Sequence, residues 1–321
     1  MNDLHQQLIR IVREKTPEGV NPVDFLSEII PIKKESLYRR LRGEMPFTLE
    51  EAAKIAVQLE ISLDALLPYK SNETYKINME RIGIGNYLDS GYLTSLDRLL
   101  DKLRYLQSLP NSMYYCTTNT LPLTFLYKYS ALSKFRVFVL NYQFREEITP
   151  PKFSEFTVHP AINMAEKSFL AEASRLPLTY VWTKGLFLPF ISEVRFFQEL
   201  GLLSKDDASV LKEESYAMLD EMENAVSRGE METGAPFNVY LSDNFFDNNC
   251  LYLEAPSFRL CSVKVFGFSL YSTTEPGLCD NMKEWIVSLM KCSVLISKGG
   301  VIERFNFFRD QRDYLKGIDE F

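Results

Sequence analysis

The sequence predicts a two-domain protein, in which an all-α domain of five short helices precedes a mixed α/β (α+β) domain with a large helical part. Its 321 residues exceed the usual length of one compact domain. Residues 1–68 show short apolar stripes at helical spacing between prolines and glycines, whereas residues 91–321 mix such stripes with aromatic and β-branched runs. Residues 69–90 are polar with scattered glycine, and we interpret them as a linker.

Capping and breaking residues bound the first three predicted helices. Asn21 caps the second helix, whose first position is Pro22, and Pro31 ends that helix. The third helix is expected over residues 33–42 and is closed by Gly43. The first helix has one apolar face, made by Leu4, Leu8, Ile11 and Val12.

A capping box begins the fourth helix, because Thr48 is followed three residues later by Glu51. Ser62 caps the fifth helix, residues 63–67, and Pro68 ends it. We expect the fourth helix to bury one set of apolar side chains: Leu49, Ala52, Ala53, Ile55, Ala56 and Leu59.

The first half of the larger domain is expected to be mainly helical. An amphipathic helix with leucines from Leu93 to Leu109 comes first, and a buried strand over residues 113–117 follows. Residues 122–144 are very apolar and are expected to be a helix. Residues 169–228 are expected to be rich in helices. The clearest of these is capped by Ser204 and has Val210, Leu211, Met218, Leu219 and Met222 on its apolar face.

The second half alternates strands and helices. Runs of Val, Phe, Tyr and Leu separated by turn residues predict strands within residues 237–241, 250–254, 258–272 and 293–297. Helices are expected over residues 277–290 and 301–316, the last one burying Ile302, Phe305, Phe308 and Leu315.

Composition limits the possible chemistry. The net charge is −7, so contact with nucleic acid would require a local basic patch. The five cysteines (Cys116, Cys250, Cys261, Cys279 and Cys292) are widely spaced and accompany only two histidines, which excludes a disulfide framework or a zinc site. We therefore expect reduced, mostly buried thiols, with no metal and no cofactor.

No secretory signal is visible at the N-terminus, and no apolar run reaches membrane-spanning length. The most apolar candidate, residues 135–144, is short and flanked by Lys134 and Arg145. We expect a cytoplasmic protein without membrane contact.

Residues 23–67 carry the pattern of a helix-turn-helix, in which one helix braces a second helix that enters the major groove. Such a unit needs inner apolar residues on both helices, a residue that stops the first helix, and an apolar plug in the turn. The residues that meet these needs are Leu26 and Ile30 on the bracing helix, Pro31 and Ile32 in the turn, and Leu37 and Leu41 on the reading helix.

The reading helix is strongly basic. Residues 33–42 contain five cations and one anion, Glu35, which gives a local charge of +4 on an acidic chain. A basic stripe therefore coincides with the helix that would read the groove.

These residues resemble the Cro and phage-repressor type of helix-turn-helix, the XRE family. The most specific parts are Leu37-Tyr-Arg-Arg-Leu-Arg-Gly at the end of the reading helix and Ile61-Ser-Leu-Asp-Ala-Leu-Leu at the close. The resemblance covers about 65 residues and implies a five-helix domain that binds operator DNA as a dimer. It also implies that the start and outer face of residues 33–42 touch DNA. We assign base contacts to Lys33, Lys34, Ser36, Tyr38 and Arg39, and phosphate contacts to Arg42 and also to Lys34.

The sequence departs from the family pattern at three positions. Pro31 replaces the usual glycine of the turn, and Ser27 replaces a small residue, usually alanine, on the bracing helix. Arg40 stands at a usually apolar position of the reading helix, where we expect it to bury its stem and project its charged head.

The larger domain shows no catalytic pattern. His159 has no neighbouring nucleophile and is expected to be structural, and Asp243 and Asp247 fit a turn better than a calcium loop. GxSxG and Walker sequences are absent. We therefore expect no enzyme activity, and a domain that senses a small-molecule or protein effector of unknown identity, or forms a homodimer. Two alternatives remain open: a protein-interaction module that uses the helical domain without DNA, and an enzyme fused to a DNA reader.

Overall fold

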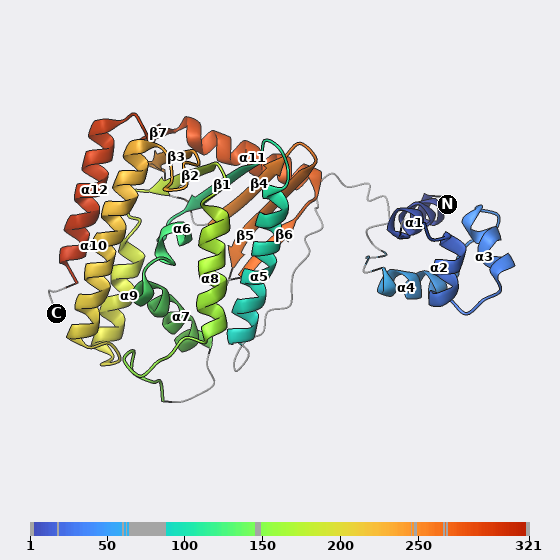
Figure 1. The fold of residues 1–321 in the computed structure, drawn as a ribbon, viewed down its shortest axis with the longest axis horizontal. Coiled ribbons are helices and arrows are strands. Elements are labelled where there is room, and N and C mark those ends of the chain that lie inside the picture. Colours follow the sequence, from blue (N-terminus) through green and yellow to red (C-terminus); the bar gives the residue numbers. More distant parts are fainter. Residues whose placement is uncertain are drawn as a thin grey trace. The chain divides into compact units, whose positions relative to one another are not determined.

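The computed structural model describes residues 3–17, 19–59, 61, 63, 88–144, 149–244, 246, 249–265, 267 and 269–318. The chain divides into two compact units, residues 1–76 and 77–321 (Figure 1). Each unit encloses hydrophobic side chains of its own. Among the described residues, no helix combines the length and the hydropathy needed to cross a bilayer.

The first unit is helical. Its described helices are α1 (Asp3–Lys15), α2 (Pro22–Ile29), α3 (Lys34–Leu41) and α4 (Leu49–Gln58). The fifth helix predicted over residues 63–67 lies almost wholly outside the described residues. Two of the expected caps are present: the side chain of Asn21 accepts a hydrogen bond from the Val23 amide, and Thr48 and Glu51 form a capping box. The predicted cap Ser62 lies outside the described residues.

The core of this unit joins all four helices. Its fully buried members are Val12 of α1, Leu26 of α2, Leu37 of α3 and Ile55 of α4. The prediction that Leu49 is buried was wrong, since its side chain is 80% exposed. Leu49 precedes Ile55 by six positions, which places it about 120° around the helix from the buried stripe.

The second unit is built on a seven-stranded mixed sheet with the order β6-β5-β4-β1-β2-β3-β7. The pairs β1–β2 and β2–β3 are parallel, and the remaining pairs are antiparallel. The strands are β1 (Met113–Thr118), β2 (Leu178–Thr183), β3 (Phe237–Ser242), β4 (Cys250–Ala255), β5 (Phe258–Val265), β6 (Ser269–Thr273) and β7 (Ser293–Leu295). Mixed α/β architecture is thus confirmed for this unit.

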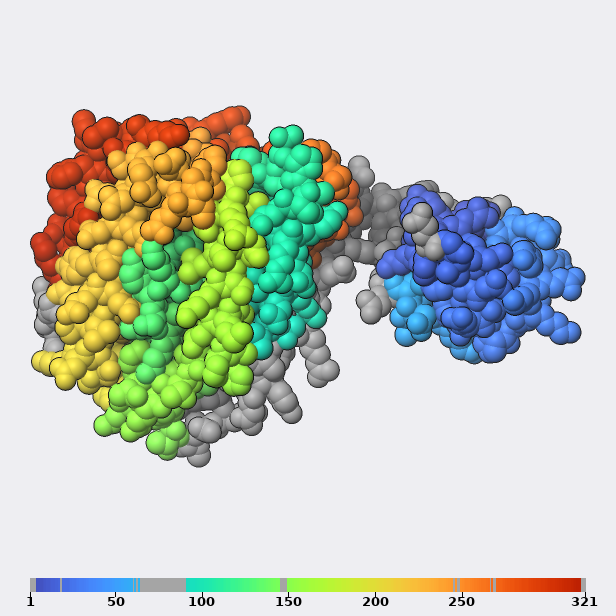
Figure 2. Space-filling view, in the orientation of Figure 1, coloured from blue at the N-terminus to red at the C-terminus, as the bar shows by residue number. Residues whose placement is uncertain are grey.

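Helices cover both faces of the sheet. One face packs against a layer that includes α5 and α10, and this layer makes up most of the face seen in the space-filling view (Figure 2). The opposite face packs against α11. The helices are α5 (Leu88–Gln107), α6 (Leu123–Leu126), α7 (Ser130–Phe144), α8 (Pro160–Ala173), α9 (Leu188–Glu199), α10 (Lys205–Arg228), α11 (Pro276–Lys291) and α12 (Val301–Lys316). α5 begins at Leu88, inside the segment interpreted as a linker.

Two segments differ from their predicted structure. The helix-rich interpretation of residues 169–228 missed β2, which lies between β1 and β3 and is buried at all six positions. A strand covered on both faces loses the polar alternation that identifies strands in sequence. The single helix expected over residues 122–144 is two helices, α6 and α7.

Three residues predicted to be apolar core are exposed. Val210 on α10 and Ile302 and Phe305 on α12 are 47%, 72% and 62% exposed, respectively. The amphipathic spacing correctly predicted both helices, but it assigned too many residues to the buried face of each one. Leu211 on α10 and Phe308 and Leu315 on α12 are fully buried, as predicted.

Candidate nucleic-acid interface

The turn between α2 and α3 accommodates Pro31 where the family pattern has glycine. Ile30 is extended (φ −121°, ψ 117°), the conformation that a following proline favours. The Ile32 amide donates to the Ile30 carbonyl at 2.8 Å, closing a tight turn around Pro31. Ile32 packs against the core of the unit, in the role of the predicted plug. The turn therefore needs no left-handed residue at position 31.

The face of α3 that meets the core is apolar apart from one residue. Leu37 and Leu41 are buried, as predicted, and so is Arg40. Arg13 of α1 donates from Nη2 to the Leu41 carbonyl at 3.0 Å, and so satisfies a backbone acceptor at the end of α3. The opposite face of α3 is left to solvent.

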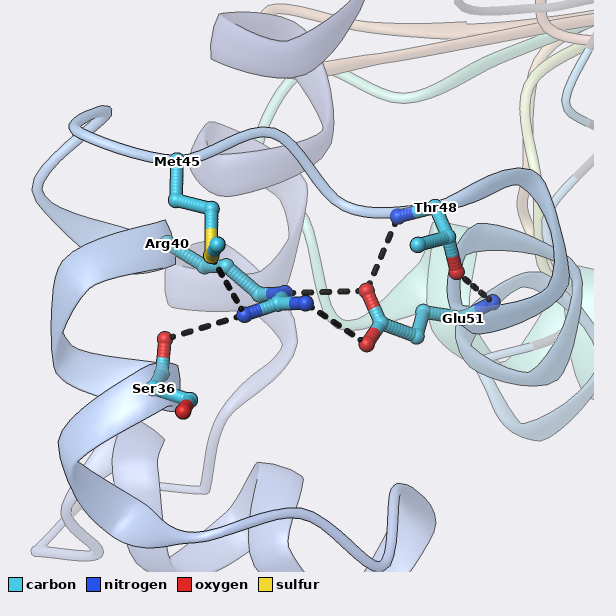
Figure 3. A network of polar contacts seen from close by, with 5 residues as sticks. All are labelled: Ser36, Arg40, Met45, Thr48 and Glu51. Atoms are coloured by element: carbon cyan, nitrogen blue, oxygen red, sulfur yellow. Dashed lines mark hydrogen bonds and ion pairs between the residues drawn. The ribbon is translucent and has the colours of Figure 1, made fainter.

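Arg40 corrects the expectation that its charged head projects outward. Its Nε and Nη2 donate to the two carboxylate oxygens of Glu51 at 2.9 and 2.8 Å (Figure 3). The side chains of Arg40 and Glu51 are only 9% and 12% exposed. Glu51 also accepts from the Thr48 amide at 2.8 Å, so the same carboxylate caps α4 and binds α3. The pair satisfies both buried charges.

The charge of Glu51 is stabilised by these contacts. Burial on its own raises the pKa of the Glu51 carboxyl, but the hydrogen bonds from Arg40 and from the Thr48 backbone outweigh burial and lower the pKa. The carboxylate is therefore ionised beside the Arg40 guanidinium.

The exposed face of α3 carries the predicted cations. Lys33, Lys34, Arg39 and Arg42 are all exposed, and only Glu35 opposes them within residues 33–42. Because Glu51 neutralises Arg40, the exposed local charge is +3 instead of the +4 counted from the sequence. Tyr38 is 43% exposed on the same helix, and Ser36 is half-buried.

Two acidic residues outside the predicted set pair with these cations. Asp24 of α2 accepts from Lys34 Nζ at 2.5 Å, and this hydrogen bond and the carboxylate charge raise the pKa of Lys34. Glu44 lies 3.6 Å from Arg39 Nε and 3.2 Å from Arg42 Nη1. All of these side chains are at least 45% exposed, so each pair contributes little to stability.

The position of Glu44 follows from the way α3 ends. Gly43 has a φ of +80°, its amide donates to the Arg40 carbonyl at 2.9 Å, and the Glu44 amide donates to the Arg39 carbonyl at 2.9 Å. This pattern is a Schellman motif. It turns the chain back so that Glu44 meets both arginines, a contact that sequence spacing alone does not reveal.

The residues considered for other chemistry have structural partners. His159 Nδ1 accepts from the Ala161 amide at 3.2 Å and caps α8. Asp243 forms an ion pair with Lys184, whereas Asp247 lies outside the described residues. Cys250, Cys261 and Cys279 are buried, Cys116 is half-buried and Cys292 is exposed, and all five are free thiols. Within the described residues, no three His, Cys, Asp or Glu side chains could jointly hold a metal ion.

Scans of the chain against protein-family models, curated proteins and solved structures found no match.

Proposed function

We propose that the chain is a cytoplasmic, sequence-specific DNA-binding transcription regulator that places α3 in the major groove. The observation that carries the proposal is the two-sided character of α3: Leu37 and Leu41 are buried, while Arg39 and its neighbouring cations are exposed. An exposed basic helix that follows a bracing helix is what groove reading requires.

Each exposed side chain has a proposed role. Arg39 offers two parallel donors for the O6 and N7 of guanine, a contact worth about 1–3 kcal/mol of discrimination. Lys33, Ser36 and Tyr38 complete the base-reading set. Lys34 and Arg42 serve phosphates, which fix the position of the helix without reading sequence.

In the absence of DNA, Asp24 and Glu44 form ion pairs with three of the exposed cations of this surface. Their pairs with Lys34, Arg39 and Arg42 are exposed, and such pairs contribute about 0–1 kcal/mol. Phosphate groups can therefore displace both carboxylates at small cost. The same carboxylates repel phosphates placed elsewhere, which favours one orientation of the helix on the duplex.

We propose that the protein acts as a homodimer through its second unit. Among the described strands, β7 lies at the edge of the sheet beside β3, and it exposes Val294 and Leu295. The start of α12 exposes Val301, Ile302 and Phe305, and a pocket between the two elements is lined by Val294 of β7 and by Glu303 and Phe307 of α12. A two-fold partner would pair identical antiparallel edges and cover this apolar surface. A second copy is also the partner that an operator with two half-sites requires.

The test is selection of bound oligonucleotides from a random duplex pool by the full-length protein, followed by salt titration on the enriched sequence. Arg39→Ala is expected to lose about 1–3 kcal/mol of binding and to relax one base position. Arg10→Ala is the matched control, because Arg10 is 72% exposed on α1 and pairs with Glu14 at 3.4 Å. Lys34→Ala should weaken all sequences alike and reduce the salt slope by about 1.

Failure to enrich any sequence, together with equal binding by the Arg39→Ala and Arg10→Ala variants at every salt concentration, would exclude groove reading by α3. The helical unit would then be better explained as a protein-interaction module. A protein partner would have to be sought with the same two variants.

A further inference from the structure

The second unit contains a cavity of about 90 Å³ between the helical layer and the sheet. Residues of α5, α7 and α8 line it on one side, and residues of β1, β4 and β5 line it on the other. In Figure 1, α5 and α8 run side by side in front of these strands. A water molecule requires only about 10–15 Å³ of such space, so the cavity can hold a small organic molecule.

Two cations face this cavity, Arg136 of α7 and Lys264 of β5. Both also line a neighbouring pocket of about 200 Å³, so they stand at the boundary of the two spaces. Most of the other side chains around the cavity are leucines and aromatic residues. A mostly apolar site with a few convergent polar groups is the usual form of a small-molecule pocket.

Neither cation forms a salt bridge within the described residues, although the charge of Glu166 acts on Arg136 and the charge of Glu193 acts on Lys264. Arg136 Nη2 donates to the Gly267 carbonyl at 2.9 Å, while its Nε is buried without a hydrogen-bond partner. No ion pair or side-chain hydrogen bond of Lys264 occurs among the described residues. A buried donor without a partner is costly, so an acceptor placed beside these two cations would be favourable.

The nearby carboxylates are engaged elsewhere or face the neighbouring pocket. Glu166 accepts from Tyr92 Oη at 3.0 Å and from the Ser133 hydroxyl, and Tyr92 also contacts Tyr127 Oη at 2.9 Å. Glu193 lines the neighbouring pocket. Neither carboxylate comes within 4.0 Å of a nitrogen of Arg136 or Lys264.

The environment of Lys264 would favour an anion beside its ammonium group. Burial, followed by the positive charge of Arg136, lowers the pKa of the Lys264 ammonium to about 7. An anion beside both groups would oppose this effect. The thiol of Cys116 faces the same cavity, but burial raises its pKa to about 12, so it is an uncharged wall residue.

We propose that this cavity binds a small monocarboxylate with a short apolar body. The carboxylate lies beside the Arg136 guanidinium and accepts a hydrogen bond from Lys264, and the apolar body packs against side chains such as Leu96, Phe169 and Leu251. One negative charge, and not the two of a phosphate, fits a site with one permanent cation and one readily neutralised amine. The role of this ligand as an effector of DNA binding rests on the proposed function, whereas its binding does not.

The test is titration calorimetry of the full-length protein without DNA, using butanoate, hexanoate, their neutral amides and inorganic phosphate. Hexanoate is expected to bind at least tenfold more tightly than hexanamide, and more tightly than phosphate. Lys264→Met and Arg136→Gln should each weaken hexanoate binding at least tenfold. Lys291→Met is the matched control, because Lys291 is exposed at the end of α11.

A second readout separates loss of the site from loss of the fold. At pH 7, Lys264 should be acetylated by a limiting amine-reactive ester faster than Lys291, and hexanoate should slow this reaction at least threefold at Lys264 only. Unchanged tryptophan fluorescence of Lys264→Met would show that its second unit is folded, since both tryptophans lie there. Equal binding of acid and amide, a preference for phosphate, or full hexanoate affinity in Lys264→Met would each overturn the proposal.

Discussion

Replacing Arg40 by leucine should strongly destabilise the first unit, because it removes one partner of a buried ion pair and not an exposed charge. The substitution Arg40→Leu leaves the Glu51 carboxylate, 12% exposed, without the two hydrogen bonds at 2.9 and 2.8 Å that now satisfy it. Removing one partner of a buried pair costs about 3–5 kcal/mol. Because a small part of both side chains still reaches water, we expect the lower end, about 3 kcal/mol.

The double substitution Arg40→Leu/Glu51→Gln tests the cause of this loss. Glutamine keeps an oxygen that can accept from the Thr48 amide, so the capping box survives, while no charge remains buried. Replacing a buried ion pair by uncharged residues is often neutral or stabilising. The double variant should therefore recover most of the loss, to within about 1 kcal/mol of the wild type.

Hydrogen exchange of backbone amides in residues 34–58, followed by mass spectrometry on the full-length chain, measures this effect. A loss of about 3 kcal/mol corresponds to exchange about 150-fold faster, at about 1.4 kcal/mol per factor of ten. Tryptophan fluorescence is the internal control, because Trp182 and Trp285 lie in the second unit. If amide exchange in Arg40→Leu were less than fivefold faster than in the wild type, the stabilising role of the buried pair would be refuted. If the double variant exchanged as fast as Arg40→Leu, the loss of stability would be due to packing and not to the buried charge.

Three further predictions concern Glu44, Glu51 and Phe305. Glu44→Gln should tighten DNA binding severalfold at low salt and not at high salt, measured by fluorescence anisotropy, because it releases Arg39 and Arg42. The pKa of Glu51 is lowered in the folded state, so its contribution to stability is complete above the pKa of the unfolded state and disappears as the pH falls through the pKa of the folded state. Amide exchange in residues 34–58 should therefore become faster in acid, and this acid dependence should be lost in Glu51→Gln. Phe305→Asp should convert the proposed dimer to a monomer in light scattering, and an unchanged mass would exclude this surface.

Local signals in the sequence were sufficient for much of the first unit. Asn21, Thr48 and Gly43 each satisfy a backbone requirement of the helix that they bound, and such requirements act within four residues. The inner residues Leu37 and Leu41 were likewise readable from helical spacing. The exposed cations then followed by elimination, since the other side of the same short helix was already assigned to the core.

Contacts between distant residues could not be predicted in the same way. Arg40 reaches Glu51 because the chain reverses after Gly43, and nothing in the spacing of 11 residues determines that meeting. An arginine at an apolar position, followed by a capping-box glutamate, was the available signal. β2 and the buried Arg136 are similar cases, because their environment is made by elements far away in the sequence.

The short length of α3 explains why these long-range contacts would matter for the proposed reading of DNA. A helix of eight residues is unstable alone, so its direction is set by what holds it. Leu37 fixes one face in the core, Arg13 of α1 binds the C-terminal carbonyl of Leu41, and Glu51 of α4 binds Arg40 in two-point fashion. Base contacts tolerate much less displacement than phosphate contacts, because hydrogen bonds to base edges depend on direction as well as distance. The buried charge in α3 is therefore best understood as a positioning contact, which keeps the exposed cations in register while contributing no charge of its own to the surface.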